Sequence, residues 1–428
     1  TKVSIAAGKT LSGSITVSAG SLKLNETGTL ASNIAMSGGS LDADESSTIS
    51  GALTQSGDIT IDVVTGKTLT YSGAGVSLGA KTLTLSGGGT LSNTNALVLN
   101  NTSSKLLLDS ITVDRVSTTS DSLGVDVDNA STITSLSVAN ITPVSIASGK
   151  SLSGGITVTD GSIKLNEAGT LASTIAMSGG SLDADESSTV SGALSHSGDI
   201  TIDVASGKTL TYSGTPISLG ANTVTLSGGG SLVSGGLTLN NASSKLLLGS
   251  ITVDNVTTTS DSLGLDVDNA STITSLSVAN ITPVSIASGK SLSGGITVTD
   301  GSIKLNEAGT LASTIAMSGG SLDADESSTV SGALSHSGDI TIDVASGKTL
   351  TYSGTPISLG ANTVTLSGGG SLVSGGLTLN NASSKLLLNS ITVDNVSTTV
   401  NNSLGVDVDN DSTITSFSVA NITPVAIA

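Results

Sequence analysis

Residues 156–173 read ITVTDGSIKLNEAGTLAS, and residues 175–192 read IAMSGGSLDADESSTVSG. Each segment begins with a short run in which apolar and polar residues alternate, turns at a glycine corner, and resumes the alternation in two further runs. Alternation with a period of two is typical of a β-strand with one buried side. The two segments therefore predict successive coils of about 20 residues, which is the period of a β-solenoid.

The composition of the whole chain suits such a narrow fold. The chain has 428 residues with no Trp, one Phe and three Tyr, so large rings cannot fill a thick core. The rhythm continues in the stretches that start at Leu194 and Ile217, and no amphipathic helix is visible. We predict an all-β fold, a parallel β-helix (β-solenoid) with about 20 residues per coil and about 21 coils, right-handed as is common for such coils.

Three long repeats organise the chain. Residues 145–248 recur unchanged at residues 285–388, an offset of 140, and the first part of the chain is a diverged copy. The predicted repeats span residues 1–141, 142–281 and 282–422, and residues 423–428 start a further repeat in the same register. Because the chain begins inside the pattern, we expect a mature product or a piece of a longer chain, built as one rod about 100 Å long.

Charge and composition exclude several classes of partner. The formal net charge is −18, from 33 acidic and 15 basic residues, which disfavours nucleic acid because phosphate binding needs clustered Lys and Arg. No run of 18 apolar residues is present, so membrane insertion is not expected. Cysteine is absent, which excludes disulfides and thiolate metal sites.

An outward ladder of carboxylates is the best candidate for a metal site. Alignment of the coils on their glycine corners stacks Asn25, Asp44 and Asp62, and carboxylates one coil apart repel unless protonated or bridged by a cation. Calcium, which prefers hard oxygen ligands, would fit. The candidate calcium ligands are Asp44, Asp62, Asp185, Asp203, Asp325 and Asp343. The alternative, which we favour because no EF-hand or nonapeptide spacing is present, is a solvated face that keeps the protein soluble.

The same alignment makes predictions about neighbouring ladders. It stacks Leu22, Leu41 and Ile59 inward, and it puts Lys23 beside Asp42 as an exposed ion pair. A second acidic strand recurs in the three repeats, with Asp126, Asp128, Asp266, Asp268, Asp407 and Asp409.

No catalytic arrangement is found. His196 and His336 are equivalent, but the first repeat has Gln55 there, so we interpret both histidines as solvent-exposed residues without a catalytic role. The run of three glycines that starts at Gly87 lacks the Lys-Ser/Thr of a phosphate loop. Enzymes of the pectate-lyase class carry an irregular cleft with clustered acidic or basic residues, whereas this sequence is regular. We therefore predict no enzymatic activity and no resident cofactor apart from the calcium considered above.

Turn residues add two observations. Asn-x-Ser/Thr triplets start at Asn25, Asn101 and Asn140, and in a chain of this composition their occurrence alone does not establish glycosylation. The Asn100-Asn101 and Ser103-Ser104 corners predict hydrogen-bonded ladders at turns. Paired threonines such as Thr157 and Thr159 are not expected to stack coil after coil, which argues against ice binding.

The coil rhythm, for example GSLKLNETGTLAS at residues 20–32, resembles the β-helical stalks of bacterial surface adhesins. Filamentous haemagglutinin-like proteins, autotransporter passenger regions and giant tandem-repeat surface proteins are the relatives implied. The resemblance extends over the whole chain and implies secretion by a bacterium or an archaeon, display at the cell surface, and a spacer or adhesive role.

The expected function is structural. Neither end shows a helical or charged cap, so an apolar cross-section and unpaired backbone groups would be open to another coil stack. We expect an extracellular rigid rod that stacks head to tail with copies of itself into a filament, or continues a longer repeat array. The alternative is the stalk or binding region of an adhesin that recognises glycans or surfaces, although aromatic platforms for sugars are scarce.

Overall fold

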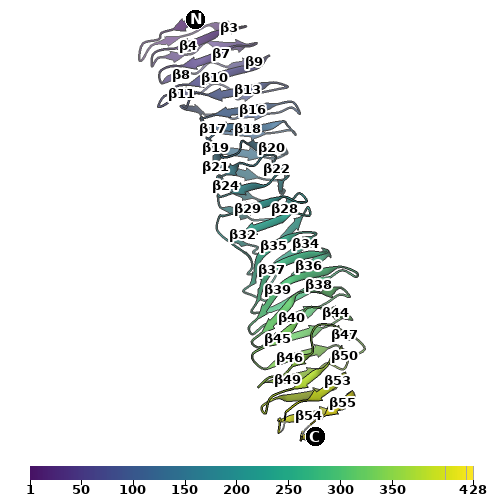
Figure 1. Ribbon diagram of the computed structural model, residues 1–428. Helices are drawn as coiled ribbons and strands as arrows, with labels where there is room; N and C mark the ends of the chain where they lie inside the picture. The colour runs from purple at the N-terminus through teal and green to yellow at the C-terminus, as the bar shows by residue number, and fades with distance from the viewer. Residues whose placement is uncertain (401, 421, 428) are drawn as a thin grey trace. The chain divides into compact units, whose positions relative to one another are not determined.

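The computed structural model describes residues 1–400, 402–420 and 422–427 (Figure 1). All regular elements of the described residues are β-strands, stacked in parallel as a β-solenoid of about 21 turns about 20 residues apart, which confirms the predicted fold class. Contacts divide the chain into unit 1, Thr1–Thr215, and unit 2, Pro216–Ala428. This boundary falls inside the second predicted repeat, so compactness and sequence repetition divide the chain differently.

Each coil of unit 1 contributes strands to three faces, named A, B and C. Face A contains β1 (Lys2–Val3), β4 (Ser21–Leu24), β7 (Ser40–Ala43), β10 (Ile59–Val63), β13 (Thr82–Ser86), β16 (Lys105–Asp109), β18 (Gly124–Asn129), β20 (Ile141–Ile146), β22 (Ser162–Leu165), β25 (Ser181–Ala184) and β28 (Ile200–Val204). Face B contains β2 (Thr10–Leu11), β5 (Thr29–Leu30), β8 (Ser47–Ile49), β11 (Thr68–Tyr71), β14 (Thr90–Asn93), β23 (Thr170–Leu171), β26 (Ser188–Val190) and β29 (Thr209–Tyr212). Face C contains β3 (Ser14–Val17), β6 (Asn33–Met36), β9 (Leu53–Gln55), β12 (Val76–Ser77), β15 (Leu97–Leu99), β24 (Thr174–Met177) and β27 (Leu194–His196).

Three strands of unit 1 continue from face B into face C without an intervening loop: β17 (Thr112–Thr118), β19 (Ser131–Val138) and β21 (Ser151–Val158). Strand β17 accordingly pairs with both β14 and β15 of the preceding coil. In the middle of each of these strands two or three consecutive residues are not buried, which breaks the alternation, and the register between β19 and β21 shifts at this point. These coils therefore also contribute to three faces, with a change of alternation inside the strand in place of a corner loop.

Unit 2 has the same three faces. Its face A contains β31 (Thr223–Ser227), β34 (Lys245–Gly249), β36 (Gly264–Asn269), β38 (Ile281–Ile286), β40 (Ser302–Leu305), β43 (Ser321–Ala324), β46 (Ile340–Val344), β49 (Thr363–Ser367), β52 (Lys385–Asn389), β54 (Gly405–Asn410) and β56 (Val425–Ile427). Face B contains β32 (Ser231–Ser234), β41 (Thr310–Leu311), β44 (Ser328–Val330), β47 (Thr349–Tyr352) and β50 (Ser371–Ser374). Face C contains β30 (Ile217–Ser218), β33 (Leu237–Leu239), β42 (Thr314–Met317), β45 (Leu334–His336), β48 (Ile357–Ser358) and β51 (Leu377–Leu379). The strands that join faces B and C are β35 (Thr252–Thr258), β37 (Ser271–Val278), β39 (Ser291–Val298), β53 (Thr392–Thr398) and β55 (Thr413–Val419).

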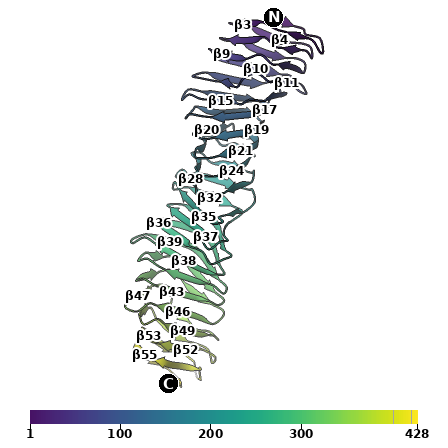
Figure 2. The ribbon, with the colours of Figure 1, turned by 180° about the vertical axis from the view of Figure 1, so that it is seen from behind.

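The core is a set of aliphatic ladders between the faces. In β10, which reads ITIDV, the three aliphatic side chains are buried while Thr60 and Asp62 lie on the outward side. Within each unit the strands of successive coils lie one above another, as Figure 1 and the reverse view in Figure 2 show. Because these strands pair in parallel, the side chains of successive coils stack. A fold of this kind buries one side of every strand and continues the buried stripe from coil to coil.

The register between coils differs from the sequence alignment at one corner. Leu22 pairs with Leu41 as expected, but Leu41 pairs with Ile61, so the expected place of Ile59 in this ladder was wrong. The reason is corner length, since β7 starts directly after Gly39 whereas two residues separate Gly57 from the residue that pairs with Ser40. A shift of two residues preserves the inward and outward sides of a strand, so the burial pattern was predicted correctly while the partners were not.

The corners depend on close backbone approach. Gly39 has a φ of 78°, and a Cβ there would lie 2.1 Å from the carbonyl oxygen of Gly20 in the preceding coil. Only glycine meets both conditions. Within the part of the chain that the structure describes, there is no helix with the length and apolar character needed to cross a bilayer.

Candidate functional sites

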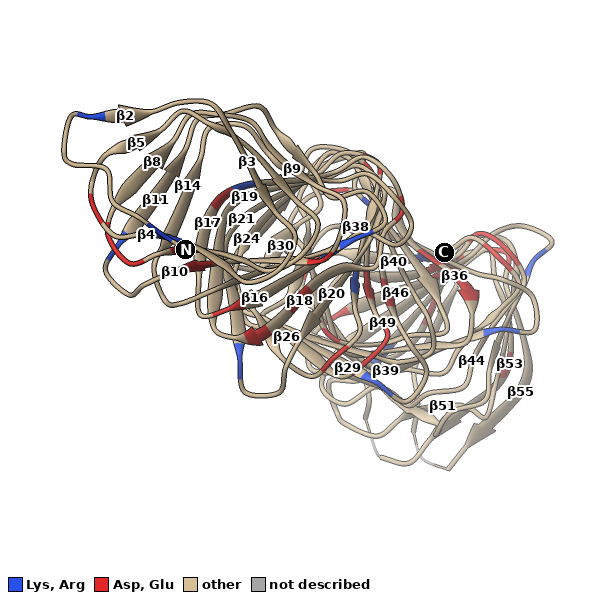
Figure 3. Ribbon diagram, turned by 90° about the horizontal axis from the view of Figure 1, so that it is seen from above, with Lys and Arg blue, Asp and Glu red and all other residues tan. Residues whose placement is uncertain are grey.

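Charged residues occupy short stretches of the ribbon (Figure 3). Several of them form ion pairs on the outward side of face A. The Nζ of Lys23 lies 3.7 Å from the Oδ2 of Asp42 and 3.4 Å from the Oδ1 of Asp44. The expected ion pair between Lys23 and Asp42 is therefore confirmed, and Asp44 belongs to the same cluster. Exposed pairs of this kind contribute about 0–1 kcal/mol each.

The carboxylate ladder differs from the expected one. Asp62 pairs with Asp42, and the expectation that it stacks on Asp44 was wrong because of the two-residue shift at the preceding corner. In the other repeats the stacked pairs are likewise Asp183 with Asp203 and Asp323 with Asp343, in place of the expected Asp185 with Asp203 and Asp325 with Asp343. Two carboxylates one coil apart do occur in each repeat, but one member of each pair was not among the predicted ligands.

Serine hydroxyls and lysines surround these carboxylates. Ser21 donates to Asp42, and the Oγ of Ser86 donates to the Oδ1 of Asp62 at 2.7 Å. Equivalent bonds join Ser162 to Asp183 at 2.6 Å, Ser302 to Asp323 at 2.6 Å and Ser367 to Asp343 at 2.5 Å, and ion pairs join Lys164 to Asp185 at 3.3 Å and Lys304 to Asp325 at 3.4 Å. These hydrogen bonds and opposite charges offset the repulsion between the stacked carboxylates.

The metal prediction gains no further ligands from the structure. Among the described residues no group of three or more His, Cys, Asp or Glu side chains is placed to hold one ion. Calcium binding at Asp44, Asp62 and their equivalents stays a prediction. In the structure, the carboxylates that stack one coil apart, and that a calcium ion could bridge, are Asp42 and Asp62.

Aspartates of the second acidic strand also form ion pairs with lysines. Lys105 pairs with Asp126, the Nζ of Lys245 lies 2.6 Å from Asp266, and the Nζ of Lys385 lies 2.7 Å from Asp407. Each lysine stands one coil before its aspartate on face A. These carboxylates therefore belong to ion pairs between neighbouring coils.

The outward side of face B carries threonine ladders. Thr10, Thr29, Thr48 and Thr70 pair in four successive coils, and Thr68, Thr90, Thr112 and Thr132 form a second series. The hydroxyls of Thr29, Thr48 and Thr70 make no hydrogen bond to any described residue. As predicted, Thr157 does not continue a threonine ladder, since it pairs with Ala176. On face B, however, threonines do stack coil after coil, which was not predicted from the sequence.

The backbone ladder of face C is interrupted once in each unit. Within unit 1, β9 pairs with β6 and β12 pairs with β15, but β9 and β12 do not pair although they lie in successive coils. In the described part of unit 2, β45 pairs with β42 and β48 pairs with β51, but β45 and β48 likewise do not pair with each other. Buried backbone groups at such an interruption need other partners.

A buried tyrosine supplies two of those partners. The hydroxyl of Tyr71 accepts the backbone N–H of Leu53 at 3.0 Å and donates to the carbonyl of Ala74 at 2.6 Å. Burial raises the pKa of the Tyr71 phenol, and the hydrogen bond from Leu53 acts in the opposite direction. Tyr352 makes the same two bonds, with Leu334 at 3.0 Å and Thr355 at 2.8 Å. The phenol therefore replaces the missing strand pairing.

Space for this phenol comes from a glycine. A Cβ at Gly73 would lie 2.8 Å from the hydroxyl of Tyr71 and 2.3 Å from the carbonyl of Gly51. Sequence reasoning missed this arrangement, although the three tyrosines of the chain recur at one position of each repeat and each precedes Ser-Gly. That recurrence was the available signal.

The polar residue at the end of β9 and β45 lies beside the same interruption. The Nε2 of Gln55 donates to the carbonyl of Leu78 at 3.0 Å, while the Nδ1 of His336 lies 3.0 Å from the carbonyl of Gly338. Because a carbonyl only accepts, Nδ1 of His336 carries the proton. His336 pairs with the inward Met317 and its Nε2 is buried, so the expectation of a solvent-exposed histidine was wrong.

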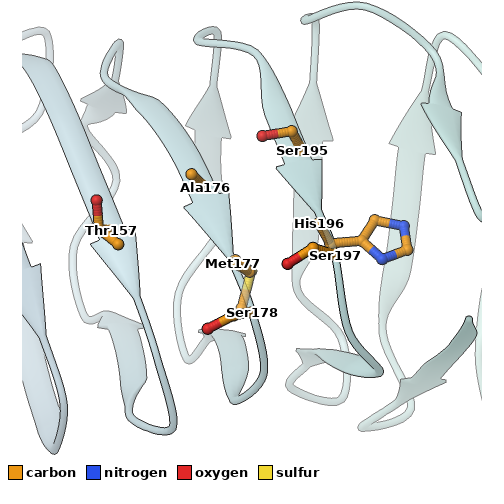
Figure 4. A pocket seen from close by; sticks show the side chains of 7 residues that line it. All are labelled: Thr157, Ala176, Met177, Ser178, Ser195, His196 and Ser197. Carbon is orange, nitrogen blue, oxygen red and sulfur yellow. The ribbon is translucent and has the colours of Figure 1, made fainter.

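An open hollow lies on the outward side of face C beside the histidine. In unit 1 it measures about 320 Å³ and is lined by Thr157, Ala176, Met177, Ser178, Ser195, His196 and Ser197; the equivalent in unit 2 measures about 290 Å³. Figure 4 shows Thr157, Ala176 and Ser195 on three successive strands, with the His196 ring pointing away from the first two. The small side chain of Ala176 creates the depression, and no carboxylate or amine lines it.

The Asn-Asn and Ser-Ser corner forms hydrogen bonds between coils. The Oδ1 of Asn100 accepts the backbone N–H of Gly79 at 2.9 Å, and the Oγ of Ser104 donates to the carbonyl of the same glycine. The expected hydrogen-bonded corner is present, but its bonds run to the backbone of the preceding corner in place of stacked side chains.

Comparisons with protein-family models, with curated proteins and with solved structures found no match.

Proposed function

We propose that this chain is an extracellular, non-enzymatic structural element whose coils build a rod by stacking on further coils, either of a neighbouring copy or of a longer repeat array. The observation that carries the proposal is a shared register. Val425 of β56 pairs with Val406 of β54 just as Val144 of β20 pairs with Val125 of β18. The last strand thus has the position of an internal strand.

Inside the molecule, a strand at the position of β56 pairs with the next coil. β20 pairs onward with β22, whereas in β56 Val425 is 53% exposed and Ile427 is 79% exposed. An uncovered apolar cross-section together with an unpaired strand edge favours addition of a further coil. Cell-surface location is part of this proposal and rests on the resemblance of the coil rhythm to adhesin stalks.

A head-to-tail junction has a defined geometry. Val3 of β1 pairs with Leu24, as Val144 pairs with Leu165, so β1 and β56 occupy the same position in the coil. A neighbouring copy therefore either lays β56 directly against β1 or displaces β1 and pairs β56 with β4. Both junctions continue the ladder of inward aliphatic side chains.

Electron microscopy of the purified chain at neutral pH, with and without a calcium chelator, tests the proposal. We expect long fibres with an axial strand spacing of about 4.8 Å, and fraying on chelation if the Asp42 and Asp62 pairs hold calcium. Val425→Lys with Ile427→Lys should abolish the fibres, because charges would enter the stacking surface. Ala426→Lys, on the outward side of the same strand, is the matched control. Monomers at high concentration would contradict filament formation.

A second candidate is the stalk or binding region of a surface adhesin. It is favoured by the threonine ladders of face B, whose hydroxyls at Thr29, Thr48 and Thr70 are available to an external partner. Glycan-array binding of the whole chain tests it, with Thr48→Lys expected to weaken binding. Retention of binding in that variant, together with loss on changing Asn100 and Asn101, would move the contact to the Asn-Asn corner.

A further inference from the structure

One turn in each repeat presents an Asn-x-Ser triplet at the surface. In unit 1 it joins β15 to β16 and contains Asn101, Thr102 and Ser103, all of them exposed. In unit 2 the equivalent turns contain Asn241, Ala242, Ser243, Asn381, Ala382 and Ser383. Asn-x-Ser/Thr is the acceptor sequence for asparagine-linked glycans.

The side-chain oxygen of the asparagine accepts a hydrogen bond, which fixes the orientation of the amide. The Oδ1 of Asn101 accepts the backbone N–H of Ser103 at 2.9 Å, and its carbonyl accepts the N–H of Ser104 at 2.9 Å. The same side-chain bonds measure 2.9 Å at Asn241 and 2.9 Å at Asn381. The Nδ2 of Asn101 donates to no described residue, so the nucleophilic end of the amide is accessible.

The fold gives no role to the hydroxyl of the third residue. Ser103 contributes its backbone N–H to the turn, and its Oγ makes no hydrogen bond to any described residue. The next residue differs, since the hydroxyl of Ser104 donates to Gly79 and accepts from the N–H of Asn101. The middle residue changes from Thr102 to alanine between repeats while the serine stays. Its hydroxyl is the group that the acceptor sequence requires.

The triplet Asn100-Asn101-Thr102 overlaps the first of these turns and is also exposed, whereas several other triplets are sequestered by the fold. The Nδ2 of Asn129 donates to the Oδ1 of Asp109 at 2.8 Å. The triplet that starts at Asn140 ends on Thr142, which is fully buried. Asn25 has a buried Oδ1, and Asn255 lies within a strand paired on both sides. None of these sequestered triplets presents a free amide together with an accessible hydroxyl on an exposed turn.

We propose that Asn101, Asn241 and Asn381 are N-glycosylation sites, with a lipid-diphosphate-linked oligosaccharide as the donor. The Nδ2 forms a bond to the anomeric carbon, the bond from that carbon to the diphosphate oxygen breaks, Nδ2 loses a proton, and the lipid diphosphate leaves. Because this modification acts on chains exported from the cytoplasm, the inference rests on the proposed extracellular location.

The test uses the purified, folded full-length chain with an oligosaccharyltransferase and its lipid-linked donor, followed by mass spectrometry of glycopeptides. Glycan is expected at Asn101, Asn241 and Asn381 and not at Asn129 or Asn140. A proteolytic digest of the same chain, in which every triplet is accessible, should be modified at all of these sites. Absence of glycan from the three turns of the folded chain, with modification in the digest, would overturn the proposal.

Serine variants separate acceptor chemistry from folding. Ser103→Ala keeps the backbone N–H that Asn101 accepts, so we expect loss of the Asn101 glycopeptide with unchanged thermal unfolding, while Ser103→Thr should restore it. Glycan that persists at Asn101 in the alanine variant would contradict the assignment. The reaction with purified enzyme requires neither secretion of the chain nor filament formation. A negative result in this reaction is therefore distinct from a failure of the structural proposal, which is tested by electron microscopy.

Discussion

Faces A and B of unit 1 are alike on the inside and different on the outside. Leu85 on face A and Leu91 on face B are both buried in aliphatic ladders. Outward, Ser86 on face A is bonded to Asp62 of the preceding coil, whereas Thr48 on face B stacks between threonines and makes no hydrogen bond among the described residues. The same strand pairing thus supports a set of charged clusters on one side and a uniform hydroxyl surface on another.

The difference shows where chemical variety can enter a solenoid. Stacking keeps most inward positions aliphatic, with Tyr71 as an exception, but it leaves outward positions to be filled independently. On face A, lysines and aspartates of neighbouring coils form ion pairs, as with Lys23 beside Asp42. On face B one residue type recurs, which presents a regular array to any external surface.

The largest expected effect tests whether the inward sides are equivalent. Leu85→Ala and Leu91→Ala should each destabilise the local coil by about 2–5 kcal/mol, because each removes a fully buried side chain and leaves a cavity. Native-state hydrogen exchange of the neighbouring strands measures the change coil by coil, which suits a fold with nearest-neighbour stability. If only one of the two substitutions lowered the stability, the inward sides of faces A and B would not be equivalent.

Sequence pattern predicted which side of each strand is buried, because alternation depends only on a period of two. It predicted the stacking of Leu22 on Leu41 but not the partners at the next corner, because the length of each corner sets the register and glycine marks a corner without fixing its length. Asp62 illustrates both points, since it lies outward as expected but pairs with Asp42 in place of Asp44. Local alternation thus carries the fold class, while the candidate site depends on corner geometry.

The missed tyrosine site has a similar cause. Tyr71 lies at an inward position, where an aromatic residue is usually read as packing. Its hydroxyl is needed as a hydrogen-bond partner only because β9 and β12 do not pair with each other. Strand pairing between coils is not visible in a local sequence pattern. The interruption of face C could therefore be recognised only from the three-dimensional register.

A smaller effect is expected at that interruption, where a face B side chain completes face C. Tyr71→Phe removes the hydroxyl that accepts from Leu53 and donates to Ala74, so both buried backbone groups lose a partner. We expect a loss of about 1–3 kcal/mol in the opening free energy of this coil. Hydrogen exchange at Leu53 measures it, and an unchanged rate would mean that water replaces the phenol.

The same phenol predicts sensitivity to alkali. Burial raises the pKa of Tyr71 above its ordinary value of 10.0, so the folded state retains the proton where the unfolded state has lost it. Stability is therefore unaffected below about pH 10 and falls as the pH rises from there toward the folded-state pKa. Equilibrium unfolding followed between pH 8 and pH 11 should show this fall in the native chain and a weaker fall in Tyr71→Phe. Equal slopes would contradict the assignment to Tyr71.

The smallest expected effects separate the outward sides. Lys23→Met removes ion pairs to Asp42 and Asp44 while keeping an unbranched side chain, and should cost about 0–1 kcal/mol at low salt. Thr48→Val keeps the shape of the side chain and removes a hydroxyl that has no described partner, so no loss of coil stability is expected. Exchange rates of the two strands, compared at low and high salt, provide the measurement. Salt should abolish the difference between Lys23→Met and the native chain because screening weakens exposed pairs, and it should leave Thr48→Val unaffected. A salt-dependent cost for Thr48→Val would mean that face B takes part in the charge network of face A.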